Sequence, residues 1–126
     1  MSGFASSVSV VSVRGLVPGD ASVVYVGRAC AGWHASALGN PFRLLPGELP
    51  GAASGRFRVW LWESVVRPGQ AGVALSGAEA AAWSALCGLV AVVRAGGSVR
   101  LACWCGGAAS CHAWVVRAAV LFLLGG

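Results

Sequence analysis

The sequence predicts one small α/β domain, in which three layers are built around a mostly parallel sheet. The 126 residues match the usual size of one domain, so residues 1–126 are expected to form a single unit. Three short runs rich in β-branched residues have the pattern of strands, and helical segments separate the second run from the third. Because a strand–helix–strand connection places its two strands in parallel, this order favours a parallel sheet.

The predicted strands span residues 7–14, 22–26 and 98–103. A turn at Pro18-Gly19-Asp20 follows the first strand, and Gly27 ends the second. If the second and third strands are parallel, the residues after Val26 and after Cys103 emerge at the same edge of the sheet. Ligands of open α/β sheets bind at this edge.

The predicted helices span residues 56–66, 76–95 and 111–124. Pro68-Gly69 is expected to end the first helix, and Ser110 has the side chain of an N-cap for the last one. Residues 30–50 show no period and contain Gly, Pro and Asn, which predicts a long ordered loop.

The composition limits the partners of the chain. Hydrophobic residues make up 57% and charged residues 10%, against about 25% charged in typical soluble domains. Such a chain either buries most of its apolar surface in its own core or covers part of it with a partner. A second copy of the chain, in a homodimer, is the simplest such partner. A membrane partner is not expected, because the apolar stretch 113–124 is too short to cross a bilayer and contains Arg117.

All positive side chains are arginines: nine in number, they give a net charge of +5 and lie scattered along the chain. Arginine pairs bidentately with phosphate and carboxylate, which favours a small anionic ligand. Nucleic acid is a weaker expectation, since the sequence has no basic run. The four carboxylates are too few and too dispersed for glycosidase-like chemistry.

The five cysteines are an odd number and crowd toward the C-terminus, unlike the framework of a secreted disulfide protein. The first ten residues lack the basic start and long apolar run of a signal peptide. We therefore expect a cytoplasmic protein with reduced thiols.

The chemistry of the chain is expected at Cys103, Cys105, Cys111 and His112. In a catalytic interpretation, the N-terminus of the last helix stabilises a thiolate at Cys111, and His112 acts as base or imidazolium partner. Cys111 would then be alkylated before Cys87, which is expected on the apolar face of its helix.

A second interpretation assigns the same four residues to zinc, since three thiolates and an imidazole form a complete ligand set. The C-x-C spacing is unusual for zinc, and the adjacent Cys111 and His112 are expected to be hard to aim at one ion. No cofactor is therefore expected, with zinc as the alternative. In a third interpretation, the cysteines and His112 only pack.

A binding site for the anion is predicted beside this cluster. Gly27 and Arg28 follow the second strand, Asn40 lies in the long loop, and Ser110 begins the last helix. A guanidinium, an amide and a helix N-terminus together suit a phosphate or carboxylate. Trp33 and Trp104 are the tryptophans expected to stack on a base.

Several motifs together resemble a known family. Gly27-Arg28, then Gly39-Asn40-Pro41-Phe42, then Cys103-Trp104-Cys105 and Cys111-His112 follow the order and approximate spacing of domain of unknown function 4326, over about residues 8–120. Members of this family are small bacterial and phage proteins, and the resemblance implies no established activity. Phe57 stands where the family pattern has Tyr.

The sequence thus supports a domain that binds a nucleotide-like or other anionic ligand at a Cys/His site, with a thiolate-dependent activity as an open question. The alternative is a non-catalytic, zinc-stabilised module that binds nucleic acid or a protein partner. Whether the chain is an enzyme is not decided by its sequence.

Overall fold

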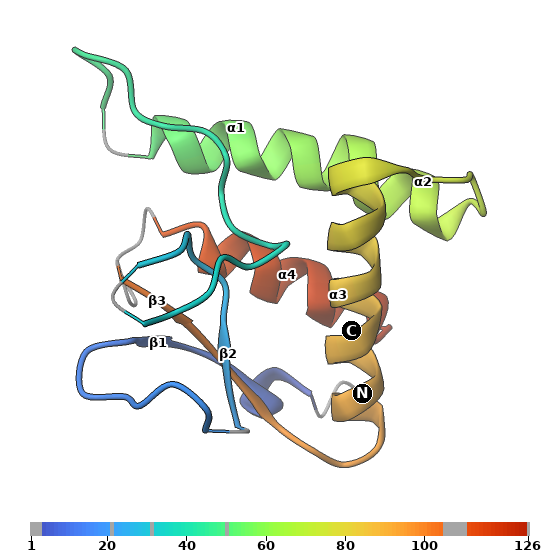
Figure 1. Cartoon of the computed structure of the whole chain (residues 1–126). Coiled ribbons are helices and arrows are strands. Elements are labelled where there is room, and N and C mark those ends of the chain that lie inside the picture. The colour runs from blue at the N-terminus through green and yellow to red at the C-terminus, as the bar shows by residue number, and fades with distance from the viewer. Residues whose placement is uncertain (1–3, 21, 31, 50, 105–110, 126) are drawn as a thin grey trace.

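The computed structural model describes residues 4–20, 22–30, 32–49, 51–104 and 111–125. Its strands are β1 (Val8–Ser12), β2 (Val23–Tyr25) and β3 (Val99–Cys103), and its helices are η1 (Ala5–Ser7), α1 (Ala52–Trp60), η2 (Leu61–Val66), α2 (Arg67–Gln70), α3 (Gly77–Arg94) and α4 (Ala113–Leu123). Figure 1 shows the three strands in the lower left part of the molecule, α1 and α2 across the top, and α3 running down the right side.

The sheet is parallel, with strand order β1-β3-β2. β3 therefore lies in the centre, and Leu101 pairs with Val10 on one side and with Val24 on the other. The predicted α/β fold class and the predicted parallel pairing of the second and third strands are confirmed.

The helices cover one face of this sheet. Val99, Leu101 and Cys103 point into a core that α3 and α4 complete with their own apolar residues. On the opposite face Ala102 is also fully buried, and here loops supply the cover. Tyr25 stacks on Trp33 from the loop after β2, with ring centroids 5.1 Å apart.

α1, η2 and α2 form one continuous helical rod across the top of Figure 1. The expectation that Pro68-Gly69 ends the helix at residue 66 is wrong. η2 is a π-helical segment, and Pro68 follows it as the second residue of α2, so the helical rod continues through the proline to Gln70. Gly69 lies against the indole of Trp83, where a Cβ would be 2.5 Å from the nearest ring atom.

α3 is long and apolar enough to cross a membrane, with a mean hydropathy of 1.3 over 18 residues. Only one stripe of this helix is buried, and it contains Leu86, Val90 and Val93. This stripe belongs to the core that α3 shares with the sheet and α4.

Candidate functional site

The end of β3 and the start of α4 bring three of the four predicted cluster residues together. The two sulfur atoms of Cys103 and Cys111 and a ring nitrogen of His112 all lie within 4.8 Å of one another, and all three residues are buried. The Sγ atom of Cys103 is 3.8 Å from Nδ1 of His112. Cys105 lies outside the described residues, as does Ser110.

The expectation that the adjacent Cys111 and His112 are hard to aim at one ion does not match the structure, where their donor atoms lie within 4.8 Å of one another. It assumed that both residues lie within the last helix, where neighbouring side chains diverge. α4 begins only at Ala113, with His112 as its N-cap residue and Cys111 before it. His112 has helical backbone angles, Cys111 lies outside the helix, and the donor atoms of both lie within 4.8 Å of the Cys103 sulfur.

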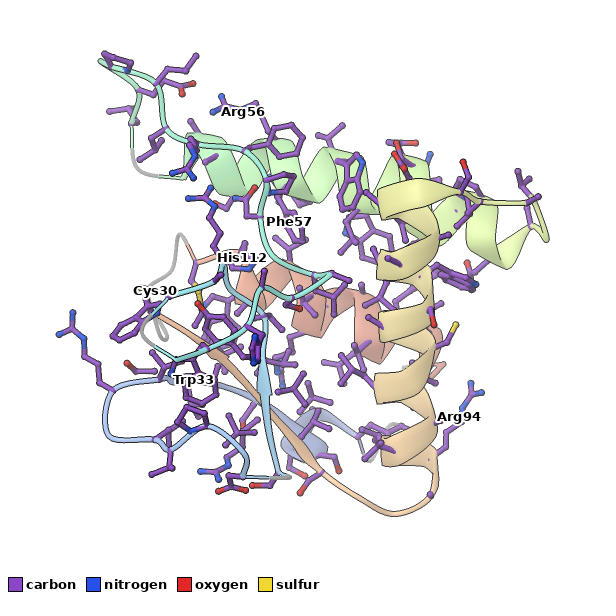
Figure 2. All side chains as sticks on the ribbon, in the orientation of Figure 1. Cys30, Trp33, Arg56, Phe57, Arg94 and His112 are labelled. Atoms are coloured by element: carbon purple, nitrogen blue, oxygen red, sulfur yellow. The ribbon has the colours of Figure 1, made fainter. Side chains whose placement is uncertain are left out.

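The imidazole of His112 is held in one orientation by β2 and α1. Its Nε2 atom donates a hydrogen bond to the carbonyl oxygen of Val26, at 2.5 Å. The ring of Phe57 meets the imidazole nearly at a right angle, with centroids 5.2 Å apart. In Figure 2, Phe57 reaches from α1 toward His112. Val26 and Phe57 are themselves fully buried, so neither partner can move away easily.

This orientation fixes the role of each ring nitrogen. A carbonyl oxygen can only accept a hydrogen bond, so Nε2 must carry a proton. In the neutral imidazole, Nδ1 is then an acceptor, and it faces the sulfur of Cys103. Such a pair can exchange a thiol proton, and the same lone pair can coordinate a metal ion.

The burial of the cysteines changes which of them can meet a ligand. Cys111 is 2% exposed, whereas Cys87 is exposed on α3, so the expected apolar environment of Cys87 is wrong. Accessibility no longer favours alkylation of Cys111 before Cys87. Of the two described cluster cysteines, Cys103 lines the neighbouring cleft.

A cleft of about 800 Å³ opens at the carboxyl ends of β2 and β3. The predicted ligand-binding residues Gly27, Arg28 and Asn40 line it, together with Cys103 and His112. Its other walls come from the ends of β2 and β3, from the long loop and from α1; they include Tyr25, Cys30, Phe42, Arg43, Ser54 and Trp104.

Arg28 and Asn40 both shape the wall of this cleft. The Nε atom of Arg28 donates to the Asn40 carbonyl at 2.9 Å, and its Nη2 donates to the Phe42 carbonyl at 2.6 Å. The side-chain Oδ1 of Asn40 accepts from the backbone N–H of Phe42 at 2.8 Å, as in an Asx turn. The Gly-Arg and Gly-Asn-Pro-Phe motifs thus meet in space, and part of their role is to hold the loop.

Gly27 leaves room for the Tyr25 side chain at this corner. A Cβ at this position would lie 2.5 Å from the hydroxyl oxygen of Tyr25. That hydroxyl donates a hydrogen bond to the Arg28 carbonyl across Gly27. The backbone carbonyl of Gly27 in turn accepts from the N–H of Ser36 at 3.0 Å, which ties the loop to the end of β2.

Sequence reasoning missed Arg43 and Phe42 as parts of the site. Both directly follow Asn40-Pro41, so proximity to that motif was the available signal. Arg43 is exposed on the cleft wall, and its backbone carbonyl accepts a hydrogen bond from Arg56 at 2.7 Å. Of the two tryptophans expected to stack on a base, Trp104 lines the cleft and is 39% exposed. Trp33 is engaged with Tyr25.

The fold and the site define a small parallel α/β domain with a buried Cys-His group at the floor of a cleft, at the carboxyl edge of its sheet. The chain belongs to the family described as Domain of unknown function (DUF4326), whose model matches residues 14–121. The resemblance seen in the sequence is thereby confirmed. No curated protein and no solved structure matches the chain.

Proposed function

We propose that the cleft binds a small anionic ligand that carries an aromatic ring, of which a nucleotide is the leading example. The observation that carries this proposal is the makeup of the cleft wall. Its described lining includes two arginines, Arg28 and Arg43, and no aspartate or glutamate.

The charge of the cleft supports the anionic part of the ligand. Uncompensated guanidinium groups in a concave site raise the local concentration of anions. The carboxylate of the long loop, Glu48, is engaged elsewhere, since it pairs with Arg56 at 2.6 Å. Arg28 uses Nε and Nη2 on the loop, which leaves its Nη1 for a ligand. Arg43 supplies a second guanidinium on the same wall.

The aromatic residues support the base part of the ligand. Trp104 presents an exposed ring on the cleft wall, and Phe42 and Tyr25 line the same space. Stacking of a base on an aromatic side chain contributes about 1–3 kcal/mol and tolerates any base. The volume of the cleft lies within the range of small-molecule sites. We also propose that the protein is located in the cytoplasm, where the Cys103 thiol that lines the cleft would stay reduced.

Calorimetric titration with adenosine 5′-monophosphate, adenosine and inorganic phosphate tests this proposal. We expect the nucleotide to bind more tightly than either fragment, because only the nucleotide engages both the arginines and the aromatic wall. Arg43→Ala should weaken nucleotide binding about tenfold, the effect of one lost charge-assisted hydrogen bond.

Arg58→Ala is the matched control. Arg58 is an exposed arginine of α1 that does not line the cleft, so its loss removes the same charge from the chain without touching the site. The control should bind the nucleotide like the wild-type protein. Equal losses in Arg43→Ala and Arg58→Ala, or no binding of any of the three compounds, would overturn the proposal.

A further inference from the structure

We propose that Cys103, Cys111 and His112 form a binding site for a thiophilic divalent metal ion, and that zinc is the ion they fit best. Two thiolates and one imidazole are a donor set that zinc accepts readily. A doubly charged ion would also neutralise two thiolates in a buried place. Hard cations such as magnesium would instead require oxygen ligands.

The distances between the donor atoms support this site. In tetrahedral zinc, bonds of about 2.0–2.3 Å set neighbouring donor atoms roughly 3.5–3.8 Å apart. Sγ of Cys103 and Nδ1 of His112 are 3.8 Å apart, and the whole group lies within 4.8 Å. A metal ion would therefore draw the third donor inward by at most about 1 Å.

The second observation is the hydrogen bond behind the histidine. Metal-bound imidazoles regularly donate their other N–H to a carboxylate or a backbone carbonyl, which fixes the ring and its tautomer. Here the Val26 carbonyl accepts from Nε2, and Nδ1 lies 3.8 Å from the sulfur of Cys103. The ring is thus already in the tautomer and the orientation that coordination through Nδ1 requires.

Burial also distinguishes this site from a chance cluster. Cys103 is 5% exposed, Cys111 2% and His112 7%, and they come from the end of β3 and the start of α4. Coordination would join these two elements across the segment that separates them. Because Cys103 and His112 line the cleft, an ion held here would also be within reach of a bound ligand.

The test begins with the wild-type protein. We expect protein expressed with added zinc and purified without chelator to hold about one equivalent of zinc by elemental analysis. After removal of the zinc, titration with Co²⁺ should produce a thiolate-to-cobalt charge-transfer band, and added Zn²⁺ should abolish it. Metal binding is measured in the absence of nucleotide and phosphate. A failure of the metal site and a failure of the nucleotide proposal are therefore separate results.

Variants then assign the ligands. Cys103→Ser, Cys111→Ser and His112→Gln should each weaken zinc binding at least tenfold, and each serine variant should lose about half of the charge-transfer band. Cys87→Ser and His34→Gln change exposed residues outside the site and should bind like the wild type. Circular dichroism identifies any variant that fails to fold.

Two results would overturn the site, and the first does not depend on how the variants fold. One is a folded wild-type protein with less than about a tenth of an equivalent of zinc and no cobalt band, because a preformed site should fill. The other is full metal binding by a folded Cys103→Ser or His112→Gln variant, which would place the ion elsewhere.

Discussion

His112 and Val26 lie 86 residues apart in the chain, and the Nε2 atom of His112 donates a hydrogen bond to the Val26 carbonyl at 2.5 Å. This bond connects the start of α4 to the end of β2. It is buried, and it fixes the imidazole against the sulfur of Cys103. One contact therefore serves both the stability of the fold and the orientation of the site.

Replacing His112 should therefore cost stability even without metal. His112→Ala removes the donor to a buried carbonyl, and an unsatisfied buried group costs about 1–3 kcal/mol. We expect the free energy of unfolding, measured by urea denaturation with a chelator present, to fall by at least this amount, since the lost ring also leaves a cavity beside Phe57.

His34→Ala is the matched control, because His34 is exposed. Its unfolding free energy should stay within about 0.5 kcal/mol of the wild type. Similar values for His112→Ala and His34→Ala would mean that the bond to Val26 contributes nothing to stability.

Two glycines in helices should respond in opposite directions to the same substitution. In Gly69→Ala, the new methyl group would lie 2.5 Å from the indole of Trp83, and overpacking of this kind costs about 1–3 kcal/mol. Gly88 lies within α3 with no atom near its missing Cβ, so Gly88→Ala should gain about 0.5–1 kcal/mol in helix propensity. Thermal and urea unfolding measure both changes. A neutral Gly69→Ala would show that Trp83 moves aside at no cost.

The fold could be predicted well from the sequence because its signals are local. β-branched runs placed the second and third strands to within a residue or two, and the apolar stripe of α3 placed that helix equally well. The first helix was harder. It begins earlier, at Ala52, and continues through a π-helical segment past Pro68. A sequence pattern of period 3.6 contains no sign of such a change in winding.

The site was only partly predictable. The carboxyl edge of the sheet follows from strand order, and Arg28 and Cys103 line the cleft at that edge. Asn40 lines the same cleft from the long loop, whose path does not follow from strand order. The directions in which individual side chains point could not be predicted from strand order. Whether Cys111 and His112 converge depends on the residue at which α4 begins, and helix starts are uncertain by one or two residues. A shift of one or two residues in the predicted start of α4 therefore decides whether the side chains of Cys111 and His112 are expected to diverge or to converge.

The pairing of Glu48 with Arg56 predicts how stability depends on acid. Arg56 donates to both carboxylate oxygens, at 2.6 and 3.0 Å, and the Leu45 N–H donates to the same group at 2.6 Å. The bond from Arg56, followed by that from Leu45, lowers the pKa of Glu48 from 4.5 to about 2. Because the folded pKa lies below the unfolded one, this contribution is complete above about pH 4.5 and is lost as the pH falls toward 2.

The free energy of unfolding should therefore fall as the pH is lowered from about 5 to 2, and Glu48→Gln should flatten part of that slope. Glu63→Gln is the matched control, because Glu63 forms an exposed ion pair with Arg67 at 3.1 Å, a type that contributes little. Urea denaturation at a series of pH values measures both slopes. Since Arg56 also donates to the Arg43 carbonyl, loss of the Glu48 pair should loosen the loop that forms the cleft wall. Nucleotide binding should accordingly weaken in Glu48→Gln and stay unchanged in Glu63→Gln. If the free energy of unfolding of Glu48→Gln depends on pH as that of the wild type does, the Glu48–Arg56 pair does not contribute to stability.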